Sequence, residues 1–169
     1  MNSTVNLYSL SYRNTKTYWF AILFITGNIL LPQICHLIPN GGFILLPIYF
    51  FTLIGAYKYG WKVGLLTALS SPLINHLLFG MPSAAVLPSI TIKSVILALS
   101  AAYIANRYKS ISLLHLLVVV LIYQIGGSLI ESLALNSLTT GFQDFRIGIP
   151  GMLLQIFGGY AFIKWVINK

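Results

Sequence analysis

Negative charge is almost absent from this sequence, whose 169 residues include only two acidic ones, Glu131 and Asp144. Charged residues of both signs make up 7% of the chain, whereas a soluble domain carries about 25%. This scarcity excludes an ordinary water-soluble fold and a disordered chain. The single cysteine, Cys35, excludes an internal disulfide. Chemistry that needs several acidic side chains, such as that of a membrane aspartyl protease, is excluded as well.

Long apolar runs are abundant instead, since 57% of the residues are hydrophobic. A membrane-spanning helix needs about 20 apolar residues, and runs of this kind recur between segments rich in Pro, Gly, Lys or Arg. We therefore expect an all-α, polytopic membrane protein, with a cytoplasmic segment at residues 1–17 and a transmembrane domain of six helices in one bundle at 18–169. The predicted helices are Tyr18–Leu37, Phe43–Tyr57, Trp61–Phe79, Ala84–Asn106, Ile111–Leu133 and Gly148–Ile167.

The basic residues predict how this bundle is oriented. With the N-terminus in the cytoplasm, six crossings place eight of the ten basic residues on the cytoplasmic side, Arg146 alone outside and Lys93 within the fourth span. Cytoplasmic loops of membrane proteins carry such an excess of Lys and Arg. We therefore expect both termini in the cytoplasm, a location in the inner (plasma) membrane, and no nucleic-acid partner despite the net charge of +8. The eight are Arg13, Lys16, Lys58, Lys62, Arg107, Lys109, Lys164 and Lys169.

Polar side chains within the predicted spans lie mostly in the outer halves of those spans. Such groups are costly in a bilayer and usually face the protein interior or a cavity. In the third span, Gly60, Gly64, Thr67, Ser71 and Asn75 follow helical spacing and form one stripe that ends in an amide. We expect a small hydrophilic cavity that opens outward. Its expected binding residues are His36, Asn75, His76, Lys93, Gln124, Glu131 and Gln155.

Two interpretations of the charged pair remain open at this point. Lys93 and Glu131 form either a structural ion pair or part of a ligand site, and the two roles are compatible because a ligand carboxylate could displace Glu131. A soft metal site formed by Cys35, His36 and His76 is the weaker alternative, since no metal-binding spacing supports it.

Motifs of enzymes are missing from the sequence. It contains no GxSxG, HExxH or Walker A motif. We therefore expect a transport protein rather than an enzyme, without an ATP site of its own and without a cofactor. Any uphill transport would take its energy from a partner or from an ion gradient.

Several short motifs occur in order along the first half of the chain. They are His36 with Gly41–Gly42, then Leu46–Tyr49, Leu53–Gly64, Ser71–Asn75 and Phe79–Pro82. Together these resemble the substrate-binding S components of energy-coupling factor (ECF) vitamin transporters. The resemblance extends over about 70 residues, from His36 to Tyr103, and the length, the six predicted helices and the basic loops agree with that family.

The resemblance implies a specific function. An S component captures a vitamin or a vitamin precursor from outside and works with one transmembrane T protein and two cytoplasmic ATPases. It implies a site near the outer face, gated here by Ile38–Ile44 and Gly80–Ser83, and it adds Tyr49 to the expected binding residues. A cationic site at Lys93 would favour a carboxylate such as pantothenate or biotin, whereas neutralisation of Lys93 by Glu131 would favour an uncharged pyrimidine or a similar molecule.

Two other classes of function remain as alternatives. One is a stand-alone carrier for a small solute driven by an ion gradient, against which the small bundle shows no internal repeat. The other is a membrane scaffold whose polar residues only hold helices together.

Overall fold

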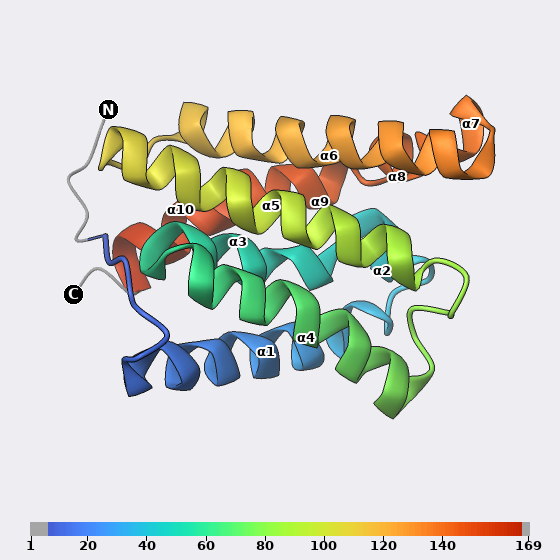
Figure 1. Cartoon of the computed structure of the whole chain (residues 1–169). Helices are drawn as coiled ribbons and strands as arrows, with labels where there is room; N and C mark the ends of the chain where they lie inside the picture. The colour runs from blue at the N-terminus through green and yellow to red at the C-terminus, as the bar shows by residue number, and fades with distance from the viewer. Residues whose placement is uncertain (1–6, 167–169) are drawn as a thin grey trace.

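All regular structure in residues 7–166, the part of the chain that the computed structural model describes, is helical, as the sequence predicts. Four long helices run side by side, and two interrupted helical segments complete the bundle (Figure 1). The long helices are α1 (Thr15–Cys35), α4 (Trp61–Phe79), α5 (Leu87–Tyr108) and α6 (Leu113–Leu135), of which α1, α4 and α6 run in one direction and α5 in the opposite one. The first interrupted segment comprises α2 (Gly41–Leu45), η1 (Pro47–Tyr49) and α3 (Phe50–Tyr59). The second comprises α9 (Ile149–Leu153), η2 (Leu154–Gly158), α10 (Gly159–Ala161) and η3 (Phe162–Val166), and it follows the short helices α7 (Leu138–Gly141) and α8 (Gln143–Ile147).

The ends of the long helices agree closely with the sequence prediction. Helix α4 has the predicted bounds, and the ends of α1, α5 and α6 differ from the prediction by two or three residues. Capping side chains set two of the starts: Asn14 accepts from the Lys16 backbone N–H at 3.0 Å, and Ser112 accepts from that of His115 at 3.1 Å.

The second and sixth predicted helices are not continuous. Leu46 lies in the left-handed region, with φ of 47°, and divides the predicted helix Phe43–Tyr57 into α2, η1 and α3. The cause is Pro47, which lacks an N–H and disfavours helical geometry in the residue before it. The predicted helix Gly148–Ile167 is interrupted by π-helical turns at η2 and η3, and its last residue lies outside the described ones.

Five helical segments within residues 7–166 are long and apolar enough to cross a membrane. They are Thr15–Cys35, Gly41–Tyr59, Leu87–Tyr108, Leu113–Leu135 and Ile149–Val166. Helix α4 has 19 residues but is not among them, since it carries Lys62 and the polar residues of its inward stripe. It nevertheless packs against α1, α3 and α5 within the same bundle. The lengths and compositions indicate an integral membrane protein.

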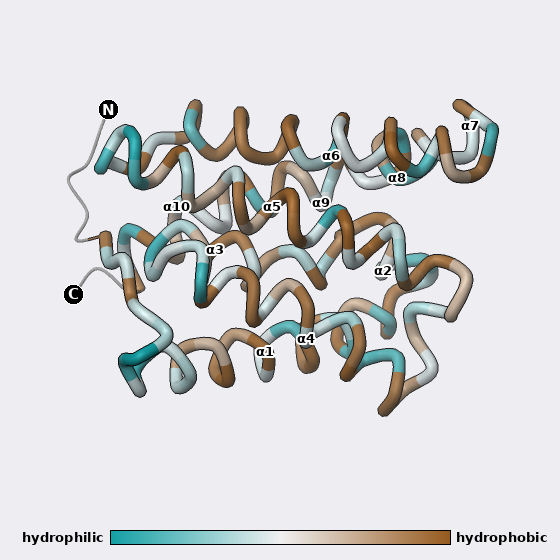
Figure 2. The backbone as a smooth tube through the Cα atoms, in the orientation of Figure 1, coloured by the Kyte–Doolittle hydropathy of each residue, from teal (hydrophilic) through white to brown (hydrophobic). Residues whose placement is uncertain are grey.

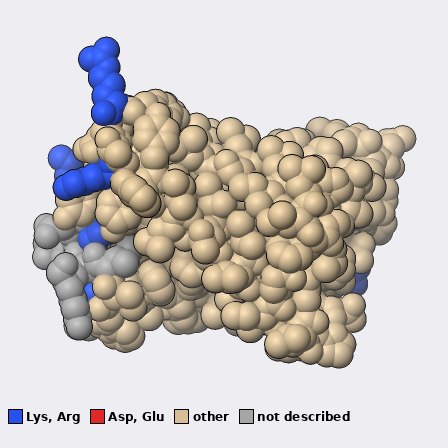
Figure 3. Space-filling model, turned by 90° about the horizontal axis from the view of Figure 1, so that it is seen from below, with Lys and Arg blue, Asp and Glu red and all other residues tan. Residues whose placement is uncertain are grey.

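The surface of the bundle is apolar along its length and basic at one end. Large hydrophobic side chains such as Trp19, Leu77 and Leu133 are more than two-thirds exposed on the long helices, and Figure 2 shows mainly hydrophobic colouring along their middle parts. In Figure 3 the Lys and Arg side chains gather at the end where α1 begins and η3 lies, with a smaller patch at the opposite end. An apolar belt between polar ends suits a protein surrounded by lipid.

The predicted stripe of α4 faces the interior, and its small residues let the helices approach closely. Gly64, Thr67, Ser71 and Asn75 are all buried. A Cβ at Gly64 would overlap Ala56 of α3 and press on Ala98 of α5. This packing of α3, α4 and α5 brings Asn75 to the inner side of the bundle, at the end opposite the basic one.

Candidate functional site

A cavity of about 350 Å³ opens at the end of the bundle where α1 and α4 end and α5 begins. Its volume lies at the lower end of the range of about 300–1,000 Å³ that is usual for small-molecule sites. Side chains of α1, η1, α4, α5, α6 and α8 contribute to its wall, together with residues 80–83 between α4 and α5. Gly42 and Phe43 of α2 close one side, so both loops that the resemblance implies as gates border this cavity.

Four of the eight predicted binding residues lie in the cavity wall: His36, Tyr49, Asn75 and Glu131. They come from α1's C-terminal cap, η1, α4 and α6, which are distant in the sequence. The His36 ring lies directly against Gly42, where any Cβ would collide with its Nε2 atom. The other four predicted residues, His76, Lys93, Gln124 and Gln155, are not among the residues that line the cavity.

Asn75 is held in one orientation by its neighbours. Its Nδ2 donates to the backbone carbonyl of Asn28 at 3.0 Å and to that of Ser71 at 2.9 Å. Both partners are acceptors, so the amide nitrogen must face them and Oδ1 must face the other way. Oδ1 is buried at the cavity wall and has no hydrogen-bond partner among the described residues.

Asn28 fixes this arrangement from α1. Its Nδ2 donates to Thr52 Oγ1 at 2.9 Å and to Ser71 Oγ at 3.3 Å, and its Oδ1 accepts from the Phe51 N–H at 3.1 Å. The fully buried Asn28 therefore joins α1, α3 and α4 beneath Asn75. Such a satisfied polar network holds helices in one relative position.

Two hydroxyl groups at the cavity are also without partners in residues 7–166. These are Tyr49 Oη and Ser89 Oγ, and both atoms are buried. The Tyr49 ring is fixed against Tyr123, with the ring centroids 5.1 Å apart. A buried polar atom that lacks a partner is costly, so the wall carries three unsatisfied groups, with Asn75 Oδ1 as the third, that a ligand or water could satisfy.

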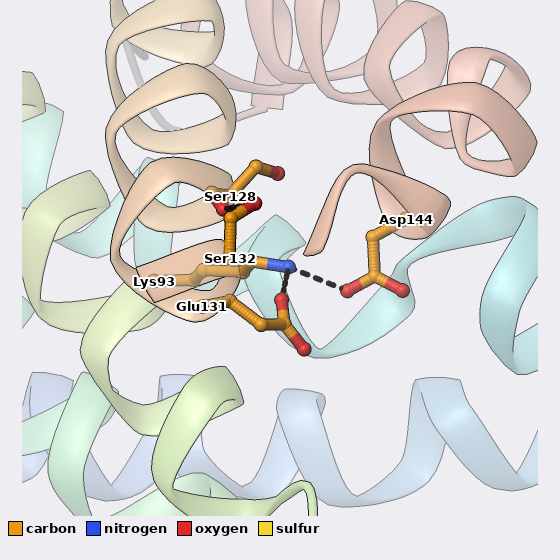
Figure 4. A network of polar contacts seen from close by, with 5 residues as sticks. All are labelled: Lys93, Ser128, Glu131, Ser132 and Asp144. Atoms are coloured by element: carbon orange, nitrogen blue, oxygen red, sulfur yellow. Dashed lines mark hydrogen bonds and ion pairs between the residues drawn. The ribbon is translucent and has the colours of Figure 1, made fainter. Parts of the chain in front are cut away.

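Both acidic residues of the chain bind Lys93 (Figure 4). Lys93 Nζ lies 2.6 Å from Glu131 Oε2 and 2.7 Å from Asp144 Oδ2. The Lys93 side chain is completely buried, whereas the carboxylates are 14% and 25% exposed and line the cavity. The ion pair that the sequence left open is thus present, with Asp144 as a third member. Ser132, which follows Glu131 in α6, donates a hydrogen bond from Oγ to the Ser128 carbonyl of the same helix at 2.7 Å.

Gly127 leaves the space through which the Lys93 side chain reaches Glu131 and Asp144. A Cβ at this position of α6 would overlap Lys93 Cγ and lie 3.3 Å from both Cδ and Cε. Helices α5 and α6 therefore approach closely enough for the Lys93 stem to cross the face of α6 at this glycine. The adjacent Gly126 has open space where its Cβ would be.

Two of the remaining predicted residues, His76 and Gln155, form hydrogen bonds that hold the structure around the cavity. His76 Nδ1 lies 2.8 Å from the Pro82 carbonyl and must donate to it, which ties residues 80–83 to α4. Gln155 accepts from the Tyr123 hydroxyl at 2.9 Å and reaches the Leu46 carbonyl at 3.5 Å. Gln124 is fully buried, and its amide has no partner within the described part of the chain.

The expected binding residues did not include Asp144 or Ser89, both of which line the cavity. Asp144 lies in the connection between the fifth and sixth predicted spans, and its link to Lys93 depends on the fold of α7 and α8. The available signal was charge: a chain with one lysine inside a span and only two acidic residues has few ways to neutralise that lysine. Among residues 7–166, no group of three or more His, Cys, Asp or Glu side chains could hold a metal ion.

Neither a protein-family model, nor a curated protein, nor a solved structure matches this chain.

Proposed function

We propose that this chain is the substrate-binding membrane subunit, or S component, of an ECF-type importer. It captures a vitamin or vitamin precursor outside the cell, and a T protein with two cytoplasmic ATPases drives uptake. The proposal rests on the motif resemblance between His36 and Tyr103, on the missing Walker A motif and on the cavity. The chain binds its substrate and does not transform it.

The proposed topology has six spans, with α4 as the third, and both termini in the cytoplasm of the plasma membrane. Seven described basic residues support it, because they lie at the N-terminal ends of α1 and α4, the C-terminal ends of α3 and α5, and η3. The eighth, Lys169, lies outside the described residues. In this topology the cavity opens to the outside, where an importer meets its substrate.

The observation that carries the proposal is a cavity bordered by both loops with buried, unpartnered polar atoms in its wall. Tyr49 Oη, Asn75 Oδ1 and Ser89 Oγ converge there from three different elements. A few placed polar groups in an otherwise apolar pocket are typical of small-molecule sites. Each of the three costs stability when left unsatisfied, and a ligand that enters the cavity could satisfy all of them.

Capture of partners from the native membrane tests the transporter assignment. The tagged chain is purified in mild detergent after crosslinking, and the recovered proteins are identified by mass spectrometry. We expect two ATPases and one further membrane protein. Recovery of the chain alone would contradict the assignment and favour a stand-alone carrier or a scaffold.

Ligand binding by the purified chain without ATP tests the site itself. We expect a member of a vitamin panel to raise the melting temperature of the wild type. Ser89→Ala should reduce this effect, because it removes one unpartnered hydroxyl from the cavity. Ser100→Ala is the matched control, since Ser100 lies on the same helix and bonds the Leu97 carbonyl at 3.1 Å. If the ligand raised the melting temperature of Ser89→Ala and Ser100→Ala equally, the binding site would lie elsewhere.

A further inference from the structure

The cavity wall offers hydrogen-bond acceptors in excess of donors. Asn75 presents only its carbonyl oxygen, since both N–H groups of the amide already donate to backbone carbonyls. Glu131 and Asp144 each use one oxygen on Lys93, and the second oxygen of each carboxylate accepts no hydrogen bond within residues 7–166. Ionised carboxylates can only accept.

The charge at this wall is negative. Lys93 contributes one positive charge and the two carboxylates contribute two negative ones, so the three together carry a net charge of −1 when ionised. Their placement increases the asymmetry: the carboxylates line the cavity, whereas the ammonium group is fully buried behind them and is not part of the wall. A ligand in the cavity therefore meets oxygen atoms rather than the ammonium group.

We propose that the cavity selects a small molecule that presents a cationic or neutral N–H donor group to Glu131, Asp144 and Asn75, and that it rejects carboxylates. This inference rests on the proposed function and narrows its substrate class. It favours amines, amidines and amino-substituted rings over pantothenate- or biotin-like acids. Donation to an ionised carboxylate gives a stronger hydrogen bond than one between neutral groups.

A ligand carboxylate could accept from the hydroxyls of Tyr49 and Ser89 in the wall, but these neutral donors give weaker hydrogen bonds than a charged group does. To reach Lys93 it would have to displace a carboxylate, and two already hold the ammonium group at 2.6 and 2.7 Å. Displacing Glu131 would leave Asp144 in place beside the incoming negative charge. The Asp144 carboxylate and a ligand carboxylate bound to the same ammonium group would repel each other strongly in this partly buried site.

Matched probe pairs test the inference on the purified full-length chain in detergent. The pairs are nicotinamide with nicotinate, pyridoxamine with 4-pyridoxate, and pantothenol with pantothenate, measured by thermal shift and by calorimetry. We expect binding of a compound without a carboxylate, that is, of nicotinamide, pyridoxamine or pantothenol. Its carboxylate counterpart should bind with an affinity at least about tenfold lower. Tighter binding of the carboxylates would overturn this inference but leave small-molecule capture intact. If neither set binds, both the inference and the proposed function fail.

Variants of α8 separate local charge from general effects. Asp144→Asn removes one negative charge from the wall. We expect the affinity for pyridoxamine, the cationic probe, to fall about tenfold. Gln143→Lys is the matched control, because it changes the charge of the same helix by the same amount at an exposed position outside the cavity wall. Asp144→Glu keeps the negative charge and should bind pyridoxamine much as the wild type does. Unchanged affinity in Asp144→Asn, with a wild-type melting temperature, would contradict the inference.

Discussion

Two neighbouring glycines of α6 provide a direct test of the close approach at Lys93. Gly126→Ala adds a methyl group where the structure has open space. Gly127→Ala adds the same group one residue later, where it would overlap Lys93 Cγ. The lysine cannot retreat freely, because its Nζ is held by Glu131 and Asp144. The two substitutions are chemically identical and differ only in what the new methyl group meets.

The expected free energies have opposite signs. Replacing glycine by alanine inside a helix stabilises a protein by about 0.5–1 kcal/mol, and Gly126→Ala should show this gain. Gly127→Ala makes the same gain but overpacks a filled interior, which costs about 1–3 kcal/mol, and it weakens the ion pairs of Lys93 further. We expect a net loss of about 1–2 kcal/mol for Gly127→Ala, and hence a gap of about 1.5–3 kcal/mol between the variants.

Thermal unfolding of the purified variants in one detergent measures this gap. For a chain of this size, 1 kcal/mol corresponds to a shift of about 2–4 °C, so Gly126→Ala should melt about 3–12 °C above Gly127→Ala. The Gly127→Ala variant should also bind the ligand more weakly, because displacing Lys93 moves both carboxylates. Equal melting temperatures, or a more stable Gly127→Ala variant, would refute the described path of Lys93 across α6.

Three further substitutions test other parts of the structure. Lys93→Met leaves Glu131 and Asp144 without a counter-ion and should destabilise the protein by about 3–5 kcal/mol. Adding Glu131→Gln and Asp144→Asn should recover much of the loss, and an unchanged melting temperature in Lys93→Met would contradict the ion-pair account. Asn28→Ala removes the bridge between α1, α3 and α4 and should cost about 2–4 kcal/mol by leaving buried groups unsatisfied, together with weaker ligand binding; wild-type values of both would show that Asn75 is positioned otherwise. Lys109→Gly should raise the melting temperature by an amount corresponding to about 1 kcal/mol, because Lys109 caps α5 with φ of 50°; a lower melting temperature would argue against that conformation.

The helical class and the long helices could be predicted because the lipid environment demands long apolar runs. Helix α4 was predicted with its observed bounds, since Gly60 and Gly80 adopt positive φ on either side of it. The break at Leu46 was missed. Pro47 suits the first turn of a helix, but α2 precedes it as a separate short helix, and this depends on the packing of α2 against α9.

The candidate site was predicted in part, according to how far each contact depends on long-range packing. Helical spacing alone identified Asn75 as the end of a buried stripe. Depth in the spans identified Lys93 and Glu131, but it could not reveal which polar atoms face the cavity and which face neighbouring helices. Gln155 shows the difference, because it contacts Tyr123 and the backbone of Leu46 instead of the cavity. Asp144 required knowledge of where the α6–α9 connection folds back.

The most direct test of the account is to identify what the cavity holds in the cell. The tagged protein is purified in mild detergent from its native membrane, and small molecules released on denaturation are identified by mass spectrometry. The double variant Tyr49→Phe/Asn75→Leu, which removes two unpartnered polar groups from the wall, is treated identically. The account predicts one N–H-bearing small molecule that is enriched with the wild type and lost with the variant. Identical small-molecule profiles from the two proteins would contradict a binding function for this cavity.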